Sequence, residues 1–215
     1  LIRGWKTLRL RLAELDLKNQ VALSLGKGKE TPLEKAADDY VYSLTVLRDD
    51  IMSEHLPYIA INVSSPNTPN LRLLQNAKAI RMLVEKCVAV SPRPVVVKFA
   101  PDFNSIKEYR QTLDSALQGG AGGIIVTNTT TNHSLAPLPE ELKNFGGGLS
   151  GKPLAELGRT YLKETLKITR GKVPVISSGG IFSPEEARHR IDMGADLVQV
   201  YTGFIFYGPN FAVNA

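Results

Sequence analysis

Five polar side chains crowd into residues 62–68, which read Asn-Val-Ser-Ser-Pro-Asn-Thr and directly follow the apolar run at 58–61. This segment holds no carboxylate, histidine or cysteine, so its chemistry must rely on serine hydroxyls and asparagine amides, with or without a cofactor. Several converging amides suit a heterocycle with alternating N–H and C=O edges. Asparagines are also common in turns for backbone reasons, so turn geometry explains any single one equally well.

Lys98 ends an otherwise apolar run, the three valines at 95–97. An unpaired buried ammonium is costly, so we expect Lys98 to face the mouth of the site and to meet an anion there. The alternative is a lysine whose aliphatic stem lies along the surface while its ammonium reaches water.

Further polar and glycine-rich clusters follow the later apolar runs, at 127–130, 146–151, 178–180 and 201–203. Glycines let backbone N–H groups approach an anion closely, as phosphate sites require. A glycine pair after a strand often forms only a turn. Two such clusters at the ends of the last two units together favour a phosphate site.

Six short runs rich in β-branched residues are predicted strands, and amphipathic segments between them are predicted helices. The strands are 21–25, 58–63, 94–99, 123–127, 173–177 and 197–201, and the helices are 32–47, 77–90, 105–118, 153–169 and 183–193. Near-continuous apolar content is typical of strands buried on both faces of a parallel sheet. Ser183 followed by Pro184 predicts a capped helix start, and Gly194 predicts the stop.

Strict alternation of strands and helices indicates the α/β class. There is no GxGxxG after the first strand, and polar residues follow strand after strand. Both observations favour a (β/α)8 TIM barrel, whose site lies at the carboxyl ends of the strands. About six of the eight βα units are visible, and such barrels typically need about 250 residues. We therefore predict a single TIM-barrel domain over residues 1–215 that is incomplete at its N-terminus, where the first residue is Leu1.

The composition narrows the possible partners. A net charge of +5 suits a phosphate-bearing ligand, but the basic residues are spread out and predict no nucleic-acid binding. Cys87 is the single cysteine and sits in a predicted helix, where a buried small hydrophobe is favoured over a nucleophile. His55, His133 and His189 are isolated, so no metal site is expected.

Residues 5–17 carry Lys6, Arg9 and Arg11 interleaved with leucines. This pattern fits a basic helix on a membrane surface, although we favour the amphipathic helix of a preceding βα unit. No run approaches the roughly 20 apolar residues that a spanning helix needs.

Five ordered motifs resemble dihydroorotate dehydrogenase, the flavin enzyme of de novo pyrimidine (UMP) biosynthesis, over roughly residues 20–210. They are the segment at 62–68, Val-Lys-x-Ala-Pro-Asp at 97–102, Thr-Asn-Thr-Thr at 127–130, Gly-Gly-Leu-Ser-Gly-Lys-Pro at 147–153 and Ser-Gly-Gly at 178–180. A serine at the base position resembles the class 2 enzymes, which pass electrons to a quinone. That resemblance implies membrane association through an N-terminal region outside this chain. The location would be the mitochondrial inner membrane in a eukaryote or the inner cell membrane in a bacterium.

The resemblance implies a role for each matched residue. Ser65 would remove the C5 proton of dihydroorotate, with Thr68 or a water as relay, while a hydride passes from C6 to N5 of FMN. The residues implied to bind the pyrimidine are Asn62, Asn67, Asn128 and Thr129. Those implied to bind FMN are Ser24, Asn62, Lys98, Thr127, Ser150, Gly151, Ser178, Gly179, Gly180, Tyr201 and Thr202. Lys98 would stabilise the negative charge of the reduced flavin.

Two departures from the family pattern and three alternatives stand beside this interpretation. Ser24 occupies a position where the family usually has asparagine, and the family's first strands, which hold flavin and the substrate carboxylate, are not in this chain. One alternative is a class 1-like relative with another acceptor, which Ser65 disfavours. Another is a non-redox phosphate-binding barrel such as an isomerase or aldolase, with Lys98 as a Schiff-base residue. The third is an incomplete, inactive piece of the dehydrogenase.

Overall fold

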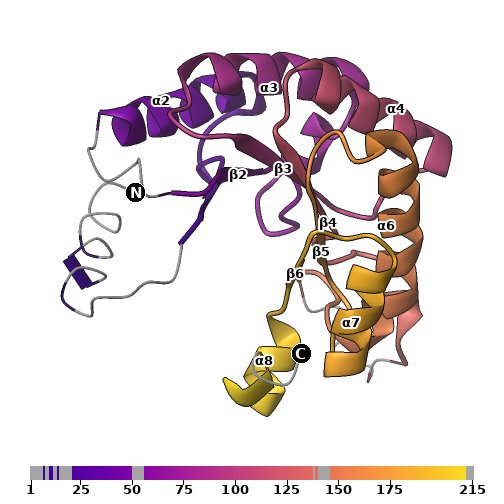
Figure 1. The fold of residues 1–215 in the computed structure, drawn as a ribbon. Coiled ribbons are helices and arrows are strands. Elements are labelled where there is room, and N and C mark those ends of the chain that lie inside the picture. The colour runs from indigo at the N-terminus through magenta and orange to yellow at the C-terminus, as the bar shows by residue number, and fades with distance from the viewer. Residues whose placement is uncertain are drawn as a thin grey trace.

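The computed structural model describes residues 21–49, 56–137, 139 and 146–211, together with residues 7, 10, 11 and 14. Six parallel strands form one sheet whose spatial order equals the sequence order, so each strand pairs with the next (Figure 1). The strands are β1 (Leu23–Gly26), β2 (Ile59–Asn62), β3 (Val95–Phe99), β4 (Gly123–Val126), β5 (Val175–Ser178) and β6 (Leu197–Gln199).

Helices follow the strands and cover the outer side of the curved sheet as a partial ring (Figure 1). They are α2 (Ala36–Arg48), α3 (Ala77–Val90), α4 (Ile106–Gln118), α6 (Ala155–Thr169), α7 (Pro184–Asp192) and α8 (Thr202–Tyr207). Short 3-10 turns precede or connect them: η1 (Leu33–Lys35), η3 (Leu71–Leu74), η4 (His133–Leu135) and η5 (Lys152–Leu154). The described part of the chain is therefore six βα units of a barrel-like arrangement.

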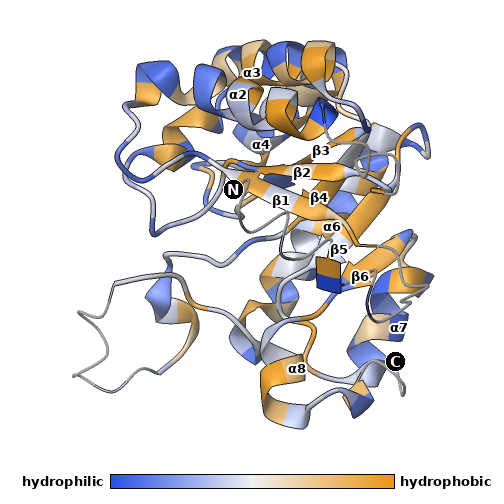
Figure 2. Cartoon of the chain, turned by 90° about the vertical axis from the view of Figure 1, so that its left-hand side faces the viewer, coloured by the Kyte–Doolittle hydropathy of each residue, from blue (hydrophilic) through white to orange (hydrophobic). Residues whose placement is uncertain are grey.

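The two faces of the sheet have different neighbours because successive side chains of a strand point to opposite sides. One set, which includes Ile61, Val97 and Ile124, packs with the apolar residues of the helices into the main core. The other set forms a small separate cluster of Ala60, Val96, Ile125 and Ile176 on the inner side. Figure 2 shows the predominantly apolar strands under helices of mixed polarity.

Helix starts are set by side-chain caps. The side chains of Asn76, Ser105 and Ser183 accept hydrogen bonds from backbone N–H groups three residues later, at distances of 3.0, 3.1 and 3.2 Å. Ser183 is followed by Pro184 at the first helical position of α7, as the sequence predicted. Gly194 has a φ of +111° just beyond that helix, which confirms the predicted stop.

The strand and helix predictions are confirmed for all six strands and five helices, with boundaries shifted by a few residues. The prediction of burial on both faces holds for β2 to β5 but is wrong for the two edge strands: Ser24 is exposed and Leu197 is 54% exposed. The sequence analysis also missed α8, whose Phe-Ile-Phe-Tyr run stays largely exposed.

Two further predictions concern Cys87 and the segment 5–17. Cys87 is fully buried in the main core, and this burial raises the pKa of its thiol to about 12, which confirms the structural role. Of the segment 5–17 the structure describes only Thr7, Leu10, Arg11 and Glu14, which have helical backbone. Within the part of the chain that is described, no helix is long and apolar enough to cross a membrane.

Candidate active site

Polar residues occupy the inner face of the sheet at the carboxyl ends of the strands. Asn62 and Lys98 are register partners on β2 and β3, and they lie one inner position beyond Ala60 and Val96. Ser178 and Gln199, register partners on β5 and β6, end those strands in the same way. The inner cluster closes the sheet below this level, so the polar ends face a shared space.

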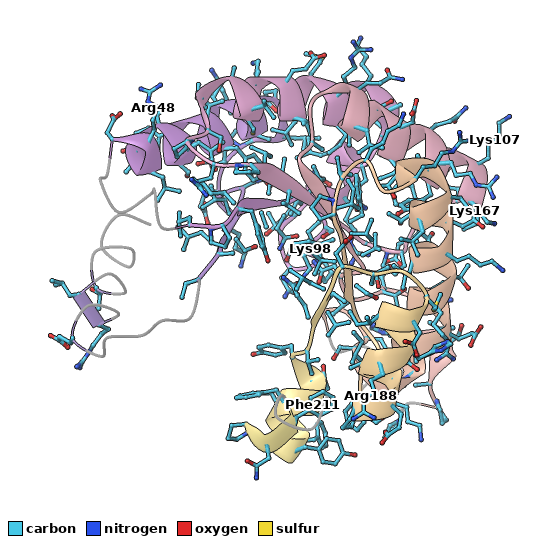
Figure 3. All side chains as sticks on the ribbon, in the orientation of Figure 1. Arg48, Lys98, Lys107, Lys167, Arg188 and Phe211 are labelled. Carbon is cyan, nitrogen blue, oxygen red and sulfur yellow. The ribbon has the colours of Figure 1, made fainter. Side chains whose placement is uncertain are left out.

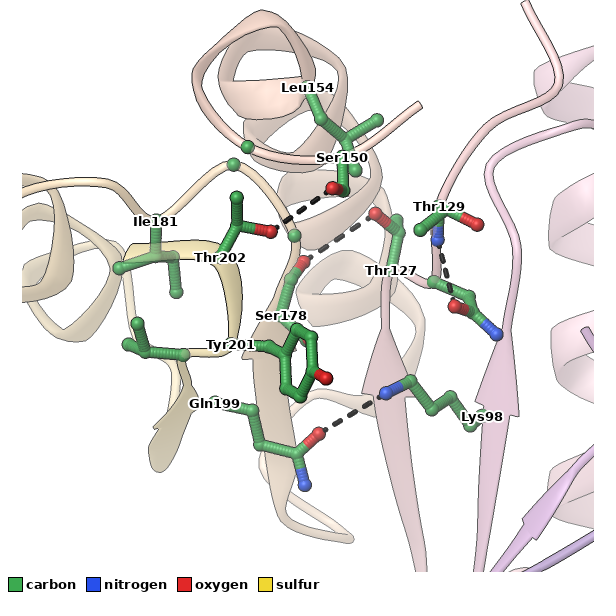
Figure 4. Close-up of a pocket in the computed structure, with 15 residues that line it drawn as sticks. Lys98, Thr127, Thr129, Ser150, Leu154, Ser178, Ile181, Gln199, Tyr201 and Thr202 are labelled. Carbon is green, nitrogen blue, oxygen red and sulfur yellow. Dashed lines mark hydrogen bonds between the residues drawn. The ribbon is translucent and has the colours of Figure 1, made fainter. Parts of the chain in front are cut away.

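That space is a pocket of about 450 Å³ (Figure 4). Fifteen residues line it: Lys98, Thr127, Asn128, Thr129, Ser150, Gly151, Leu154, Ser178, Gly179, Gly180, Ile181, Gln199, Val200, Tyr201 and Thr202. Its volume falls within the roughly 300–1,000 Å³ of typical small-molecule sites. The lining includes no carboxylate and no histidine, and among all described residues no cluster of three or more His, Cys, Asp or Glu could hold a metal ion.

The two glycines after β5 allow the backbone to approach its neighbours closely. A Cβ on Gly180 would lie 2.3 Å from Cα of Ala155, and one on Gly179 would lie 2.8 Å from Oγ1 of Thr127. Both glycines also have positive φ, +83° for Gly179 and +78° for Gly180. The loop can therefore lie directly against the start of α6 only without side chains, and its bare backbone lines the pocket as a phosphate cradle requires.

Arg190 of α7 supports that cradle from behind. Its side chain is fully buried, and it donates hydrogen bonds to Oγ of Ser177 (3.0 Å) and to the carbonyls of Ala155 (2.9 Å) and Gly179 (3.3 Å). The carboxylate of Glu186 accepts from its Nε at 2.6 Å. Burial lowers the pKa of Arg190, while the hydrogen bond and charge of Glu186 oppose this effect. This cation is thus fully used in fixing the loop.

Lys98 is a half-buried cation that, unlike Arg190, has few hydrogen-bond partners. Its Nζ lies 3.5 Å from Oε1 of Gln199, a long contact, and within the described residues no carboxylate pairs with it. Burial accordingly lowers the pKa of Lys98 from its usual 10.5. Figure 3 shows Lys98 inside the arc of strands, whereas Lys107 and Lys167 project outward from the helices. The side chain of Lys98 is thus half-buried inside the arc, and its pairing with an anionic ligand stays a prediction.

A compact amide and hydroxyl network joins the loops after β2 and β4. Oδ1 of Asn62 accepts hydrogen bonds from Oγ of Ser64 (2.8 Å) and from Nδ2 of Asn128 (3.3 Å). Nδ2 of Asn128 also donates to Oγ of Ser64 at 2.9 Å. From the other side, the hydroxyl of Tyr40 donates to the carbonyl of Asn62 at 2.8 Å. Two of the predicted substrate residues are therefore held together across 66 positions of sequence.

The loop at 146–149 lies against this network. A Cβ on Gly148 would overlap Oγ1 of Thr129 and approach Pro66 to 3.2 Å, and one on Gly147 would lie 3.6 Å from Oδ1 of Asn67. Oγ1 of Thr129 is buried and has no hydrogen-bond partner among the described residues. A buried hydroxyl without a partner in a pocket wall is a ready contact for a polar ligand.

The pocket brings together most of the residues predicted from the sequence. Eleven of its fifteen lining residues belong to the predicted set; the other four are Leu154, Ile181, Gln199 and Val200. Asn62 joins through its bond to Asn128. Ser65, Asn67 and Thr68 lie in the adjoining turn and do not line the pocket; Oγ of Ser65 accepts from the N–H of Asn67 at 3.3 Å. Ser24 does not line the pocket either, because it pairs with Ala60, one inner row below Asn62.

Besides three apolar lining residues, the sequence analysis missed two polar residues at the site, Gln199 and Arg72. Gln199 is a polar residue in an apolar strand, the same signal that identified Lys98, so it could have been found. Arg72 donates to the carbonyls of Ser64 (3.0 Å) and Thr129 (2.9 Å). Nothing in the local sequence distinguishes it from a surface arginine.

Comparison with known proteins is consistent with this geometry. The sequence model of the family described as dihydroorotate dehydrogenase matches residues 5–214. A dihydroorotate dehydrogenase (quinone) of Nautilia profundicola is 43% identical over 189 residues, which covers 88% of this chain and 50% of that protein. A protein of the same name from Chloroflexus aurantiacus is 38% identical over 219 residues, covering 96% of this chain and 59% of that protein. The chain thus spans about half the length of the curated relatives it matches.

Solved structures agree with the fold. A ligand-free DHODH from Eimeria tenella superposes with a TM-score of 0.80 at 32% identity, covering 95% of this chain and 62% of that one. A DHODH from the same organism in complex with ferulenol gives a TM-score of 0.77 at 33% identity, covering 90% of this chain and 55% of that one. The predicted α/β barrel class is confirmed, with six of its units in the described part of the chain.

We expect Gly180→Ala to destabilise the chain more than Gly171→Ala. Both positions have positive φ, which costs an alanine about 1–2 kcal/mol. A Cβ on Gly171 meets no atom within 4 Å, whereas one on Gly180 collides with the backbone of Ala155. The collision should add about 1–3 kcal/mol to the loss. Urea unfolding of the two variants measures the difference, and equal losses would contradict the close-approach argument.

We expect Lys98→Met to stabilise the ligand-free chain at pH 7 by about 1 kcal/mol, because it removes a buried cation without a charged partner. For a chain of this length, that change in the free energy of unfolding raises Tm by roughly 2–4 °C. Since the folded pKa lies below 10.5, the parent gains stability as pH rises from the lowered pKa toward 10.5, and the difference should shrink there. Lys107→Met on exposed α4 is the matched control. A Tm that falls in Lys98→Met would show that the ammonium already has a stabilising partner.

Proposed function

Because the chain belongs to the dihydroorotate dehydrogenase family, we propose that it binds FMN and oxidises dihydroorotate to orotate in pyrimidine biosynthesis. The observation that carries this proposal is the pocket at the carboxyl ends of the strands, where eleven residues expected to hold flavin or pyrimidine meet. They come from five separate segments of the chain, so their convergence is a property of the fold and not of one motif.

The donor set of the pocket fits a flavin phosphate at one end. Ser150, Gly151, Gly179, Gly180 and Thr202 would hold the phosphate, using hydroxyls and bare backbone; Oγ1 of Thr202 already lies 3.1 Å from Oγ of Ser150. Lys98, Thr127, Ser178 and Tyr201 would line the ring end. When bound, FMN supplies the acceptor, at its N5, for a hydride from C6 of dihydroorotate. Ser24 would contact the flavin from outside the pocket, because it is not among the lining residues.

The substrate would lie between the loops after β2 and β4. Asn62, Asn67 and Asn128 offer planar amides, and Thr129 offers its unpartnered hydroxyl. Ser65 would take the C5 proton. A serine hydroxyl is a poor base at neutral pH, so it must pass that proton onward, and Thr68 in the same turn is the proposed relay.

Lys98 would act through its charge. Its ammonium has only a long amide contact, and burial lowers its pKa, so an anion beside it would favour the charged form. Placed against the flavin ring, it would stabilise negative charge that develops there during reduction. A Schiff-base role in a non-redox barrel would leave the Asn62–Ser64–Asn128 network without a function.

The electron acceptor is proposed to be a quinone, supported by the name that the similar proteins of Nautilia profundicola and Chloroflexus aurantiacus carry. Membrane association, at the mitochondrial inner membrane or the inner cell membrane, is proposed on the same ground. The chain spans about half the length of these relatives, so activity of the isolated chain is part of the proposal.

We expect the purified chain, incubated with FMN, to retain a visible flavin band that dihydroorotate bleaches in the absence of oxygen. Orotate is the matched control, because it fills the same site but has no hydride to give. A flavin band that dihydroorotate leaves unchanged would contradict the proposed reaction. A colourless chain would show that these residues alone do not hold the cofactor and would favour the inactive piece.

We expect Ser65→Ala to slow flavin reduction by dihydroorotate by at least about 10²-fold, the lower end of what a positioned base contributes. FMN affinity should stay within about twofold, because Ser65 does not line the pocket. Stopped-flow absorbance measures the rate, and Ser115→Ala on α4 is the control. Reduction at the parent rate in Ser65→Ala would remove Ser65 from the mechanism.

A further inference from the structure

Arg72, in η3, connects three loops at the rim of the site. Its Nε donates to the carbonyl of Ser64 at 3.0 Å, after β2, and its Nη2 donates to the carbonyl of Thr129 at 2.9 Å, after β4. Its Nη1 forms an ion pair with Asp102, after β3, and contacts Oγ1 of Thr131 at 3.4 Å. Every hydrogen-bond partner of Arg72 among the described residues lies in these three loops.

Asp102 completes the connection. Its carboxylate accepts hydrogen bonds from Arg72, from Oγ1 of Thr130, and from the N–H (2.7 Å) and Oγ1 (2.9 Å) of Thr131. The side chains of Arg72 and Asp102 are only 19% and 17% exposed. In this partly buried pair the guanidinium donates four hydrogen bonds and the carboxylate accepts four, so the pair holds its geometry far better than a pair on the surface.

The backbone groups that Arg72 binds adjoin the proposed chemistry. The Ser64 carbonyl belongs to the peptide that leads into Ser65, so fixing it fixes the direction in which the Ser65 side chain leaves the turn. The Thr129 carbonyl follows directly on Asn128. On the inner side, the side chains of Asn62, Ser64 and Asn128 already bind one another. Arg72 therefore holds the same two loops from the outer side.

We propose that Arg72, held by Asp102, is a positioning residue that sets the spacing between the loops carrying Ser65 and Asn128. This inference rests on the proposed function, since it assigns Arg72 to the pyrimidine half of that site. Substrate binding and proton removal should depend on Arg72. Flavin phosphate binding should not, because the glycine loop after β5 is fixed separately by Arg190.

The planar guanidinium is essential to this role. One arginine directs N–H groups along separate directions to two carbonyls and a carboxylate, whereas a lysine is a single point charge on a flexible stem. Arg72→Lys should therefore retain the attraction to Asp102 but lose the geometry. Asp102→Asn keeps the shape and removes the charge, so it tests the same connection from the other end.

We expect Arg72→Ala in the FMN-loaded chain to weaken orotate binding by about ten- to hundredfold, the scale of hydrogen bonds to a charged group. Flavin reduction by dihydroorotate should slow to a similar degree, while FMN affinity changes by less than about twofold. Arg72→Lys and Asp102→Asn should also weaken orotate binding and slow flavin reduction, by smaller factors, while FMN affinity is again retained. Calorimetry gives orotate affinity, and fluorescence quenching gives FMN affinity. Arg81→Ala, which removes an exposed ion pair with Glu85 on α3 and an exposed hydrogen bond to Gln118 on α4, is the control.

The outcomes separate this inference from the proposed function. Parent-like orotate binding and reduction in Arg72→Ala would overturn the positioning role while the dehydrogenase proposal stands. An equal loss of orotate and FMN in Arg72→Lys and Asp102→Asn would also overturn it, because it would show a general structural role.

If the parent chain binds no flavin, the proposed activity of this chain fails, and hydrogen exchange still tests Arg72. Arg72→Ala should speed amide exchange in both residues 64–68 and residues 129–131, and Arg81→Ala in neither. Unchanged exchange in residues 129–131 would refute the connection.

Discussion

The in-register pairing of parallel strands is the constraint on which the rest of this structure depends. Because register partners face the same side of the sheet, the pairing of Asn62 with Lys98 places an amide and an ammonium side by side at the inner rim. The layer below them, which includes Ala60 and Val96, must then be apolar and small enough to close the inner side. A slip of one residue in β3 would turn Lys98 toward the helices and bring Val97 inside.

Much of this architecture could be predicted from the sequence, because it arises from local patterns. The apolar runs identified all six strands, and Ser183 with Pro184 identified a helix start to the residue. The errors have physical causes. Among the described residues the edge strands β1 and β6 have a paired strand on one side only, so Leu197 is exposed, and sequence composition cannot reveal a position in a sheet. Ser24 was assigned to FMN from the family resemblance; strand register places it one position below Asn62 on the inner face, and its role stays a prediction.

Contacts between distant residues were the part that the sequence could not supply. Arg72 and Asp102 are 30 positions apart; Arg72 looks like an ordinary surface charge in the sequence, and the motif that contains Asp102 does not indicate its partner. Arg190 belongs to a strongly charged helix in which Arg188 is exposed, yet Arg190 itself is fully buried. Its carbonyl and carboxylate partners distinguish it from Lys98, which has burial without such partners. Arg190 thus stabilises a loop, whereas we propose that Lys98 meets a ligand.

The equality of spatial and sequence order in the sheet has a consequence for how the chain folds. Each strand needs only the strand before it as a template, and the helix between them can dock as the pair forms. The ladder can therefore grow from β1 toward β6 in the order of synthesis, with modest sequence separation at every step. The contacts that close long loops, such as those of Arg72, Tyr40 and Gln199, would then form late, once the strands that carry them are in register. The site would be assembled last, on a scaffold that is already folded.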